Sequence, residues 1–158
     1  MMRSERDKLP GQYGKKVRTM NEPTRQGTPP SVEGIVSRPS PFSVEETLGR
    51  LKAAIHNRNL ILFAHIDHSG EARRVGITMQ EAQVLIFGSP KAGTPLMIAS
   101  PLLALELPLK VLVWQGEDDQ VWVSSTSSDY LRVRYALPQE LIGNIAGVDA
   151  LIEQTLQG

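Results

Sequence analysis

The sequence predicts an α+β fold in which helices pack on one face of a curved, mainly antiparallel sheet of about five strands. Several short apolar runs have the length of strands, two of them flank a strong hairpin signal, and two longer segments repeat apolar residues with a helical period. In chain order these patterns give β-α-β-β-β-β-α. We expect residues 31–158 to form one such domain, because the chain of 158 residues is long enough to bury a core without disulfides and contains no cysteine.

Turn and capping residues define the first two elements. A short strand is expected at 32–37, ending before Pro39 and Pro41, which block a strand ladder. Ser43 and Glu46 then form a capping box, which predicts the start of a helix. The apolar stripe of this helix consists of Val44, Leu48, Leu51 and Ile55.

The middle of the chain predicts three further strands, at 60–67, 83–87 and 109–115. Each is a run of apolar and β-branched residues too short for a helix with a stripe of its own. Between the last two we expect a helical turn or two at 90–99 and a loop at 101–108, where prolines interrupt the pattern.

The turn at 116–119 separates two strongly β-prone runs and predicts a hairpin. With this turn Trp114 faces Val121 and Val113 faces Trp122, so that both faces of the sheet are apolar. Helices are expected on only one of these faces. We expect the other face to meet a ligand cavity or a second copy of the protein, and we predict a homodimer.

Two helices are expected after the hairpin. Residues 127–129 supply N-caps for a short one, and Pro138 suits the first turn of a last one. Gly143 and Gly147 weaken the prediction of that last helix. Its expected apolar side consists of Leu141, Ile145, Val148, Ile152 and Leu156.

Charge is distributed unevenly along the chain. Residues 1–30 carry seven Lys and Arg and three acids, whereas the remainder carries ten and fourteen. The first segment has no apolar period, so we expect a disordered basic tail. The mildly acidic remainder argues against nucleic-acid binding. No secretory signal is recognisable, and prolines and charges interrupt the apolar stretch 94–114, so we expect a cytoplasmic protein with no membrane partner.

Four segments resemble a known family. They are FAHIDH (63–68), VLIFGSPKAGTPLM (84–97), LPLKVLVW (107–114) and SSDYLRVRYAL (127–137). In order and spacing they resemble the domain of unknown function 302 family over about residues 31–150. The resemblance implies an α+β fold similar to the TATA-binding-protein-like arrangement and association as homodimers. It implies no activity, because the family is uncharacterised.

The first candidate site is the end of the expected strand 60–67. Strand alternation places His65 and Asp67 on one face, with His68 at the strand end. An imidazole beside a carboxylate is typical of an acid–base pair or a metal site, although such a carboxylate also commonly caps a turn. We expect no metal, because the chain has three histidines and no third ligand at a diagnostic spacing.

The second candidate site is the glycine-bracketed loop at 88–94, between an expected strand and a helix. Backbone N–H groups at such a helix start suit an anion. The expected ligand contacts come from Gly88, Lys91, Gly93 and Thr94, together with His65. The loop is not a nucleotide-binding loop, because no lysine follows its second glycine and Pro90 lacks an N–H. The alternative is a plain helix start with Pro90 in its first turn.

Two aromatic groups complete the candidates. Trp114 and Trp122 could stack on a planar ligand, but no basic residues flank them, which favours packing in the core or a dimer. Tyr130 and Arg134 are one helical turn apart and either bind a carboxylate or form a surface stack, of which we favour the stack.

Three functions stay open at this point, and the sequence names no cofactor. We favour a homodimeric binding module for a small, anionic or partly apolar ligand. The alternatives are a small enzyme built on Asp67, His68 and Lys91 and a purely structural interaction domain. Convergence of those three residues in one pocket favours the enzyme, whereas an apolar cavity without them favours binding.

Overall fold

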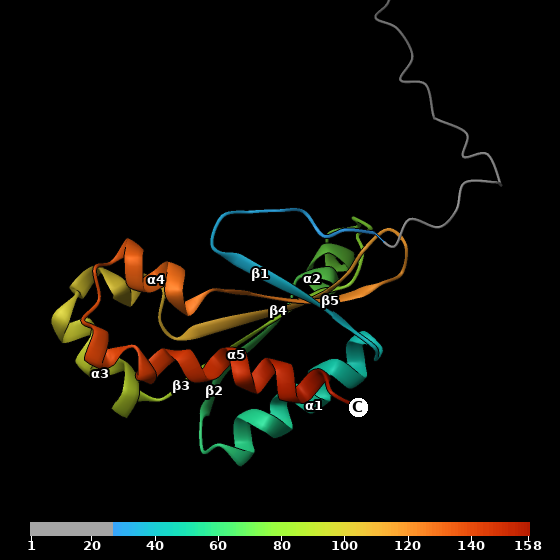
Figure 1. Ribbon diagram of the computed structural model, residues 1–158. Helices are drawn as coiled ribbons and strands as arrows, with labels where there is room; N and C mark the ends of the chain where they lie inside the picture. Colours follow the sequence, from blue (N-terminus) through green and yellow to red (C-terminus); the bar gives the residue numbers. More distant parts are fainter. Residues whose placement is uncertain (1–26) are drawn as a thin grey trace, which may run out of the picture.

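The computed structural model describes residues 27–158, in which five strands form one antiparallel sheet (Figure 1). The predicted tail at 1–30 lies almost wholly outside these residues. The strands are β1 (Ile35–Ser40), β2 (Ile61–Asp67), β3 (Ala82–Gly88), β4 (Leu109–Gln115) and β5 (Val121–Thr126). The helices are α1 (Val44–Asn57), α2 (His68–Arg74), α3 (Pro90–Ala99), α4 (Ser128–Arg134) and α5 (Gly143–Leu156), with 3-10 turns η1 (Pro101–Leu105) and η2 (Gln139–Leu141).

The spatial order of the strands is β1-β5-β4-β3-β2, with every neighbouring pair antiparallel. The strands β2 to β5 therefore follow one another as a meander, and β1 returns to the far side of β5. This arrangement confirms the predicted α+β fold with an antiparallel sheet of about five strands. It leaves β2 as one edge of the sheet and β1 as the other.

The main core lies between one sheet face and the helices α1 and α5, which run below the sheet in Figure 1. α1 begins where predicted, because the Ser43 hydroxyl accepts a hydrogen bond from the Glu46 N–H at 3.1 Å. Its expected apolar stripe is buried. The core residues are Val44, Leu48, Leu51 and Ile55 of α1, Leu85 and Phe87 of β3, Val111, Val113, Val121 and Val123 of the hairpin, and Val148, Leu151 and Ile152 of α5.

A second, smaller core holds α3, η1, α4 and the start of α5 together at one end of the sheet. Its buried members are Leu96, Leu103, Leu131, Leu137 and Ile145. We call this assembly the end lobe. It lies at the left of Figure 1, around the label α3.

The predicted pairing of the hairpin is wrong by one residue. Trp114 pairs with Trp122, and Val113 pairs with Val123, because the turn between the strands is one residue longer than expected. Since side chains alternate along a strand, the valines all face the helices and both tryptophans lie on the opposite face.

Two expected boundaries also shift, and one helix is additional. β1 reaches Ser40 and includes Pro39, which an edge strand tolerates because its N–H side can face away from the ladder. A helix that the sequence analysis omits, α2, follows β2 directly. α5 begins at Gly143, later than Pro138, and continues through Gly147.

Candidate functional site

A cleft of about 390 Å³ opens between the end lobe, the start of β2 and α5. This volume lies in the range typical of small-molecule sites. Phe87 is buried and lines the cleft from the sheet side, while Met97 and Leu107 line it from the end lobe. The other lining residues are Arg58, Leu60, Phe63, Gly88, Ser89, Pro90, Ala92, Gly93, Thr94, Pro108, Leu109, Gly143, Asn144, Ile145, Gly147, Val148 and Leu151.

Glycines make the room along the α5 wall of the cleft. Gly143 and Gly147 lie one helical turn apart, and a Cβ atom added to either would meet no atom within 4 Å. A glycine inside a helix costs about 0.5–1 kcal/mol relative to alanine. No packing contact accounts for the glycine at 147, but a side chain there would enter the open space of the cleft.

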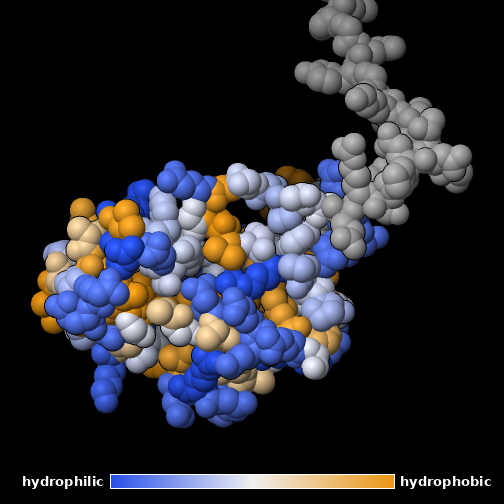
Figure 2. All heavy atoms as spheres, in the orientation of Figure 1, coloured by the Kyte–Doolittle hydropathy of each residue, from blue (hydrophilic) through white to orange (hydrophobic). Residues whose placement is uncertain are grey.

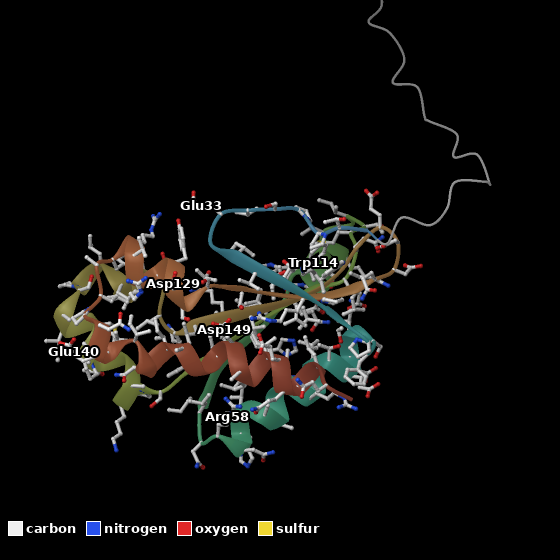
Figure 3. The ribbon with its side chains drawn as sticks, in the orientation of Figure 1. Glu33, Arg58, Trp114, Asp129, Glu140 and Asp149 are labelled. Atoms are coloured by element: carbon white, nitrogen blue, oxygen red, sulfur yellow. The ribbon has the colours of Figure 1, made fainter. Side chains whose placement is uncertain are left out.

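Polar groups at the rim tie the cleft walls together. The Asn144 side chain donates a hydrogen bond to the Ala92 carbonyl at 2.9 Å, which joins α5 to α3. Arg58 donates to the Gly147 carbonyl at 3.1 Å and to the side chain of Gln154, which joins the end of α1 to α5. Figure 3 shows Arg58 at the end of α1, on the α5 side of the sheet. Arg58 is the one charged residue among the residues that line the cleft.

The predicted anion loop contributes to the cleft with its backbone and leaves its lysine outside. Gly88, Gly93 and Thr94 line the cleft, but Lys91 does not. The Ser89 hydroxyl accepts a hydrogen bond from the Ala92 N–H at 3.3 Å, so the loop is the capped start of α3 with Pro90 in its first turn. The loop is thus a helix start of the kind that the alternative describes, and anion binding at its backbone N–H groups stays a prediction.

Asp67 also serves as a helix cap. Its carboxylate accepts hydrogen bonds from the Ser69 hydroxyl at 2.7 Å and the Gly70 N–H at 2.8 Å, at the start of α2. The bond from Ser69, then that from Gly70 and the nearby charge of Arg73 lower the pKa of the Asp67 carboxyl below its usual value. His68, the first residue of α2, is exposed, and its side chain makes no hydrogen bond within residues 27–158. The two candidates are chain neighbours that do not act as a pair.

His65 lies in a different hollow, between the sheet and the first turns of α1. Its Nε2 atom is 2.7 Å from the Gln83 side-chain oxygen, and the Gln83 amide in turn donates to Glu81 at 3.2 Å. The hollow is also lined by Glu45, Lys52 and Asp119. This hollow is open, its lining mixes charged and apolar side chains, and it contains none of the residues of the predicted loop.

The candidate residues therefore lie at opposite ends of the β2–β3 pair. Asp67 pairs with Gln83, whereas Ile61 pairs with Gly88 at the other end. Five residues of strand separate Gln83 from Gly88, or about 17 Å. Asp67 and His68 do not converge with Lys91. Within residues 27–158 no three acidic or histidine side chains are placed to hold a metal ion.

The aromatic candidates occupy two other surfaces. The rings of Trp114 and Trp122 stack with centroids 6.3 Å apart on the sheet face away from the helices. The Trp114 indole N–H donates to the Ser124 hydroxyl at 2.8 Å. Arg134 donates to the Tyr130 hydroxyl at 3.1 Å and lies over its ring, as the favoured surface stack predicts. Tyr135 and then Tyr130 raise the pKa of Arg134, which keeps its charge.

The cleft residues that matter most have little signal in the sequence. Arg58 carries no motif, because it simply ends α1 beside the returning α5. Gly143 and Gly147 were interpreted as weak points of a helix. Their spacing of four residues was an available signal, since it places both on one side of that helix.

Fold and cleft together define an α+β protein with an open antiparallel sheet and a largely apolar cleft at one end. A family model described as Domain of unknown function DUF302 matches residues 36–157, and the chain belongs to that family. The resemblance noted in the sequence is thus confirmed. Residues 27–158 contain no helix long and apolar enough to cross a membrane.

Relatives share the fold and part of the sequence. The crystal structure of the uncharacterized conserved protein DUF302 from Bacillus stearothermophilus aligns with a TM-score of 0.66 at 13% identity, over 79% of this chain and 97% of that one. Fluoride-specific ion channel FluC 1 of Brucella suis biovar 1 (strain 1330) is 31% identical over 104 residues, which are 66% of this chain and 41% of that protein. FluC 1 of Brucella abortus biovar 1 (strain 9-941) is also 31% identical, over 38% of its length. The chain therefore spans about two fifths of these curated relatives.

Proposed function

We propose that the chain is a binding module that holds a small, largely apolar ligand in the cleft at the end lobe. The observation that carries this proposal is the pair Gly143 and Gly147, which leave open space along an apolar cleft instead of filling it. Burial of apolar ligand surface there is favourable by roughly 25 cal/mol for each Å² removed from water.

The ligand has an anionic end that Arg58 binds. A guanidinium carries five N–H donors, and the contacts of Arg58 with Gly147 and Gln154 leave donors for a carboxylate or similar group. Arg58 is exposed at the rim, so the apolar part of such a ligand points inward and its charge stays near water. This chemistry matches the expected anionic or partly apolar ligand.

The enzyme alternative receives no support from the geometry. Asp67 and Lys91 lie at opposite ends of the β2–β3 pair, and the carboxylate of Asp67 already accepts two hydrogen bonds at the start of α2. Its lowered pKa also makes it a weak proton acceptor. An apolar cavity without the three candidate residues favours binding.

Calorimetric titration with decanoate, an apolar chain with one carboxylate, tests the binding function. We expect saturable binding with a negative heat-capacity change, the mark of buried apolar surface. Gly147→Leu places a side chain in the cleft and weakens binding by about tenfold or more. Gly49→Leu is the matched control, because Gly49 is a helical glycine with open space at its Cβ and lies outside the cleft. Equal affinity of the Gly147→Leu variant and the wild type would refute the proposal.

We also propose that two copies of the module associate through the open face of the sheet. Trp114 and Trp122 lie at its centre, and alternation along the strands adds Leu112, Val84, Ile86 and Ile66 to the same face. Among the described residues no long helix covers this face (Figure 1). It is several strands wide, which suits the roughly 20–30 residues that a stable interface takes from each subunit.

Light scattering tests this association. We expect the mass of two chains for the wild type and of one chain for Trp122→Glu, because a carboxylate in the centre of an apolar interface is strongly unfavourable. Val133→Glu is the control, since Val133 is 65% exposed and lies on α4, outside the strands that form the open face. A wild-type mass of one chain at micromolar concentration rules the homodimer out.

A further inference from the structure

Three aliphatic side chains on the outside of the end lobe are largely exposed to solvent. Ile98 is 78% exposed, Leu102 is 70% exposed and Leu105 is 76% exposed. They lie on the end of α3 and on η1, and we call them the apolar lip. Figure 2 shows hydrophobic side chains reaching the surface at the left end of the molecule, where Figure 1 places α3.

The lip is held in place by the second core. Leu96 of α3 and Leu103 of η1 are fully buried between the lobe's elements, so their helices cannot turn the lip inward. Residues three apart in a 3-10 helix lie on one side, which places Leu102 beside Leu105. The lip is therefore a fixed feature of the folded chain.

The lip is continuous with the cleft. Met97, which precedes Ile98, lines the cleft, and so does Leu107, two residues after Leu105. The lobe thus presents apolar groups to the cleft on one side and to the outside on the other. An apolar ligand that leaves the cleft over the end lobe meets the lip before it meets bulk water.

Two cations flank the lip, and within residues 27–158 neither has an acidic partner. Lys91 is two turns before Ile98 on the same side of α3. At the other end, the Tyr135 hydroxyl donates to the Glu106 carboxylate at 2.6 Å, next to Leu105, and Arg134 lies over the ring of Tyr135. Glu106 keeps its negative charge when it accepts this hydrogen bond, and the two cations outnumber it around the lip.

A second exposed apolar patch shows what distinguishes the lip. Val75 is 73% exposed and Ile77 is 61% exposed, just after α2. There the neighbouring arginines are paired, Arg73 with Asp67 at 3.8 Å and Arg74 with Glu71 at 2.8 Å. Neither Val75 nor Ile77 lines the cleft at the end lobe or the hollow beside His65. The lip thus combines exposed apolar groups, cations without an acidic partner and an adjoining cleft, a combination that the patch after α2 lacks.

We propose that the apolar lip docks on an anionic membrane surface, where the ligand of the cleft enters or leaves. Three side chains are far fewer than the roughly 20–30 residues that a stable protein interface takes from each partner, which disfavours a second copy here. Shallow insertion of a few aliphatic groups beside cations is the usual mode of interfacial binding to anionic lipids. Such docking lies in the plane of the interface and needs no membrane-spanning helix. The choice of an acyl-type ligand rests on the proposed function of the cleft.

Vesicle sedimentation tests the docking. Full-length protein is mixed with vesicles of phosphatidylcholine and phosphatidylglycerol at low salt, and the bound fraction is measured. We expect the variant Ile98→Ser/Leu102→Ser/Leu105→Ser to bind about tenfold or more weakly. Val75→Ser/Ile77→Ser is the matched control and should bind within about twofold of wild type. Added salt or vesicles of phosphatidylcholine alone should weaken wild-type binding.

Each outcome has a definite meaning. Equal loss in the lip and control variants, or none in either, overturns the docking. A lip variant that changes the oligomeric mass instead of vesicle binding assigns the lip to a second copy and also overturns it. Gly147→Leu separates the two proposals, because it should lose decanoate and keep vesicle binding. If wild-type protein binds vesicles through the lip but not decanoate, docking is supported and the proposed ligand is wrong.

Discussion

The two ends of the β2–β3 pair make different use of their residues. The α2 end carries polar groups that form two separate sets of hydrogen bonds. Asp67 accepts from Ser69 and Gly70, and His65 bonds to Gln83. At the α3 end the cleft is lined mostly by apolar side chains and glycines, and open space remains. Most reactive residue types at the α2 end have partners within the chain and border an open hollow with charged lining, whereas the α3 end borders a largely apolar cleft.

Residue type is therefore a poor guide to a binding site when local partners are available. A carboxylate after a strand and three residues before an N–H is in position to cap a helix, so its hydrogen bonds are used within the chain. A binding site needs unfilled volume, and volume arises where neighbouring elements bring glycines and short side chains together.

Phe87→Ala should have the largest effect, a loss of about 3–5 kcal/mol in the free energy of unfolding. The Phe87 side chain is 1% exposed and belongs both to the main core and to the cleft. Urea denaturation measures the loss, and saturating decanoate should recover part of it by occupying the enlarged cleft. Leu85→Ala, on the same side of β3 but outside the cleft, should lose about 2–5 kcal/mol with no extra gain from decanoate. If decanoate restores the same amount of stability in both variants, the cleft at the α3 end is not its binding site.

Ser89→Ala should cost about 1 kcal/mol by removing the N-cap of α3. Because the start of α3 forms one wall of the cleft, the loosened turn should also weaken decanoate binding. Ser43→Ala removes the corresponding cap of α1 and should cost a similar amount without changing decanoate affinity. Chemical denaturation and calorimetry on both variants compare the two caps. Unchanged binding in Ser89→Ala would show that the wall does not depend on its cap.

Gly147→Ala should stabilise the chain by about 0.5–1 kcal/mol, because alanine is the better helix residue and its methyl group meets open space. The same methyl group narrows the cleft, so decanoate should bind more weakly. Gly49→Ala in α1 should give the gain in stability without the loss of binding. Thermal unfolding and calorimetry measure the two effects, and a destabilised Gly147→Ala variant would mean that the space at residue 147 is not free.

Local patterns predicted most of the fold. The capping box at Ser43 and Glu46 and the stripe through Leu51 and Ile55 predicted α1, because capping and helical period involve residues a few positions apart. The hairpin register was wrong because one residue of turn length moves every later side chain to the other face. A pattern of residue types does not determine that length.

The cleft could not be predicted because it depends on distant segments. Arg58 and Gly147 meet through α1 and α5, which are far apart in sequence, and the volume beside them appears only once the end lobe has packed. The sequence did indicate Gly88, Gly93 and Thr94, since a glycine-bracketed helix start is a local signal. It favoured Lys91 equally, although its side chain lies outside the cleft.

Asp67→Asn should have the smallest effect, confined to α2 and visible only in its pH dependence. The hydrogen bonds from Ser69 and Gly70 lower the pKa of Asp67 in the folded chain, so its contribution to stability is complete above the usual carboxyl pKa and is lost as pH falls through the lowered value. The protection of the Gly70 amide, the slowing of its exchange relative to that of an unstructured amide at the same pH, should therefore fall on acidification below about pH 4. The asparagine variant keeps an oxygen acceptor but no charge, and its exchange should lack this acid step.

Decanoate affinity should stay within about twofold in Asp67→Asn and in His68→Ala, since neither residue lines the cleft. A tenfold loss in either variant would join the polar end to the binding site and end the contrast between the two ends.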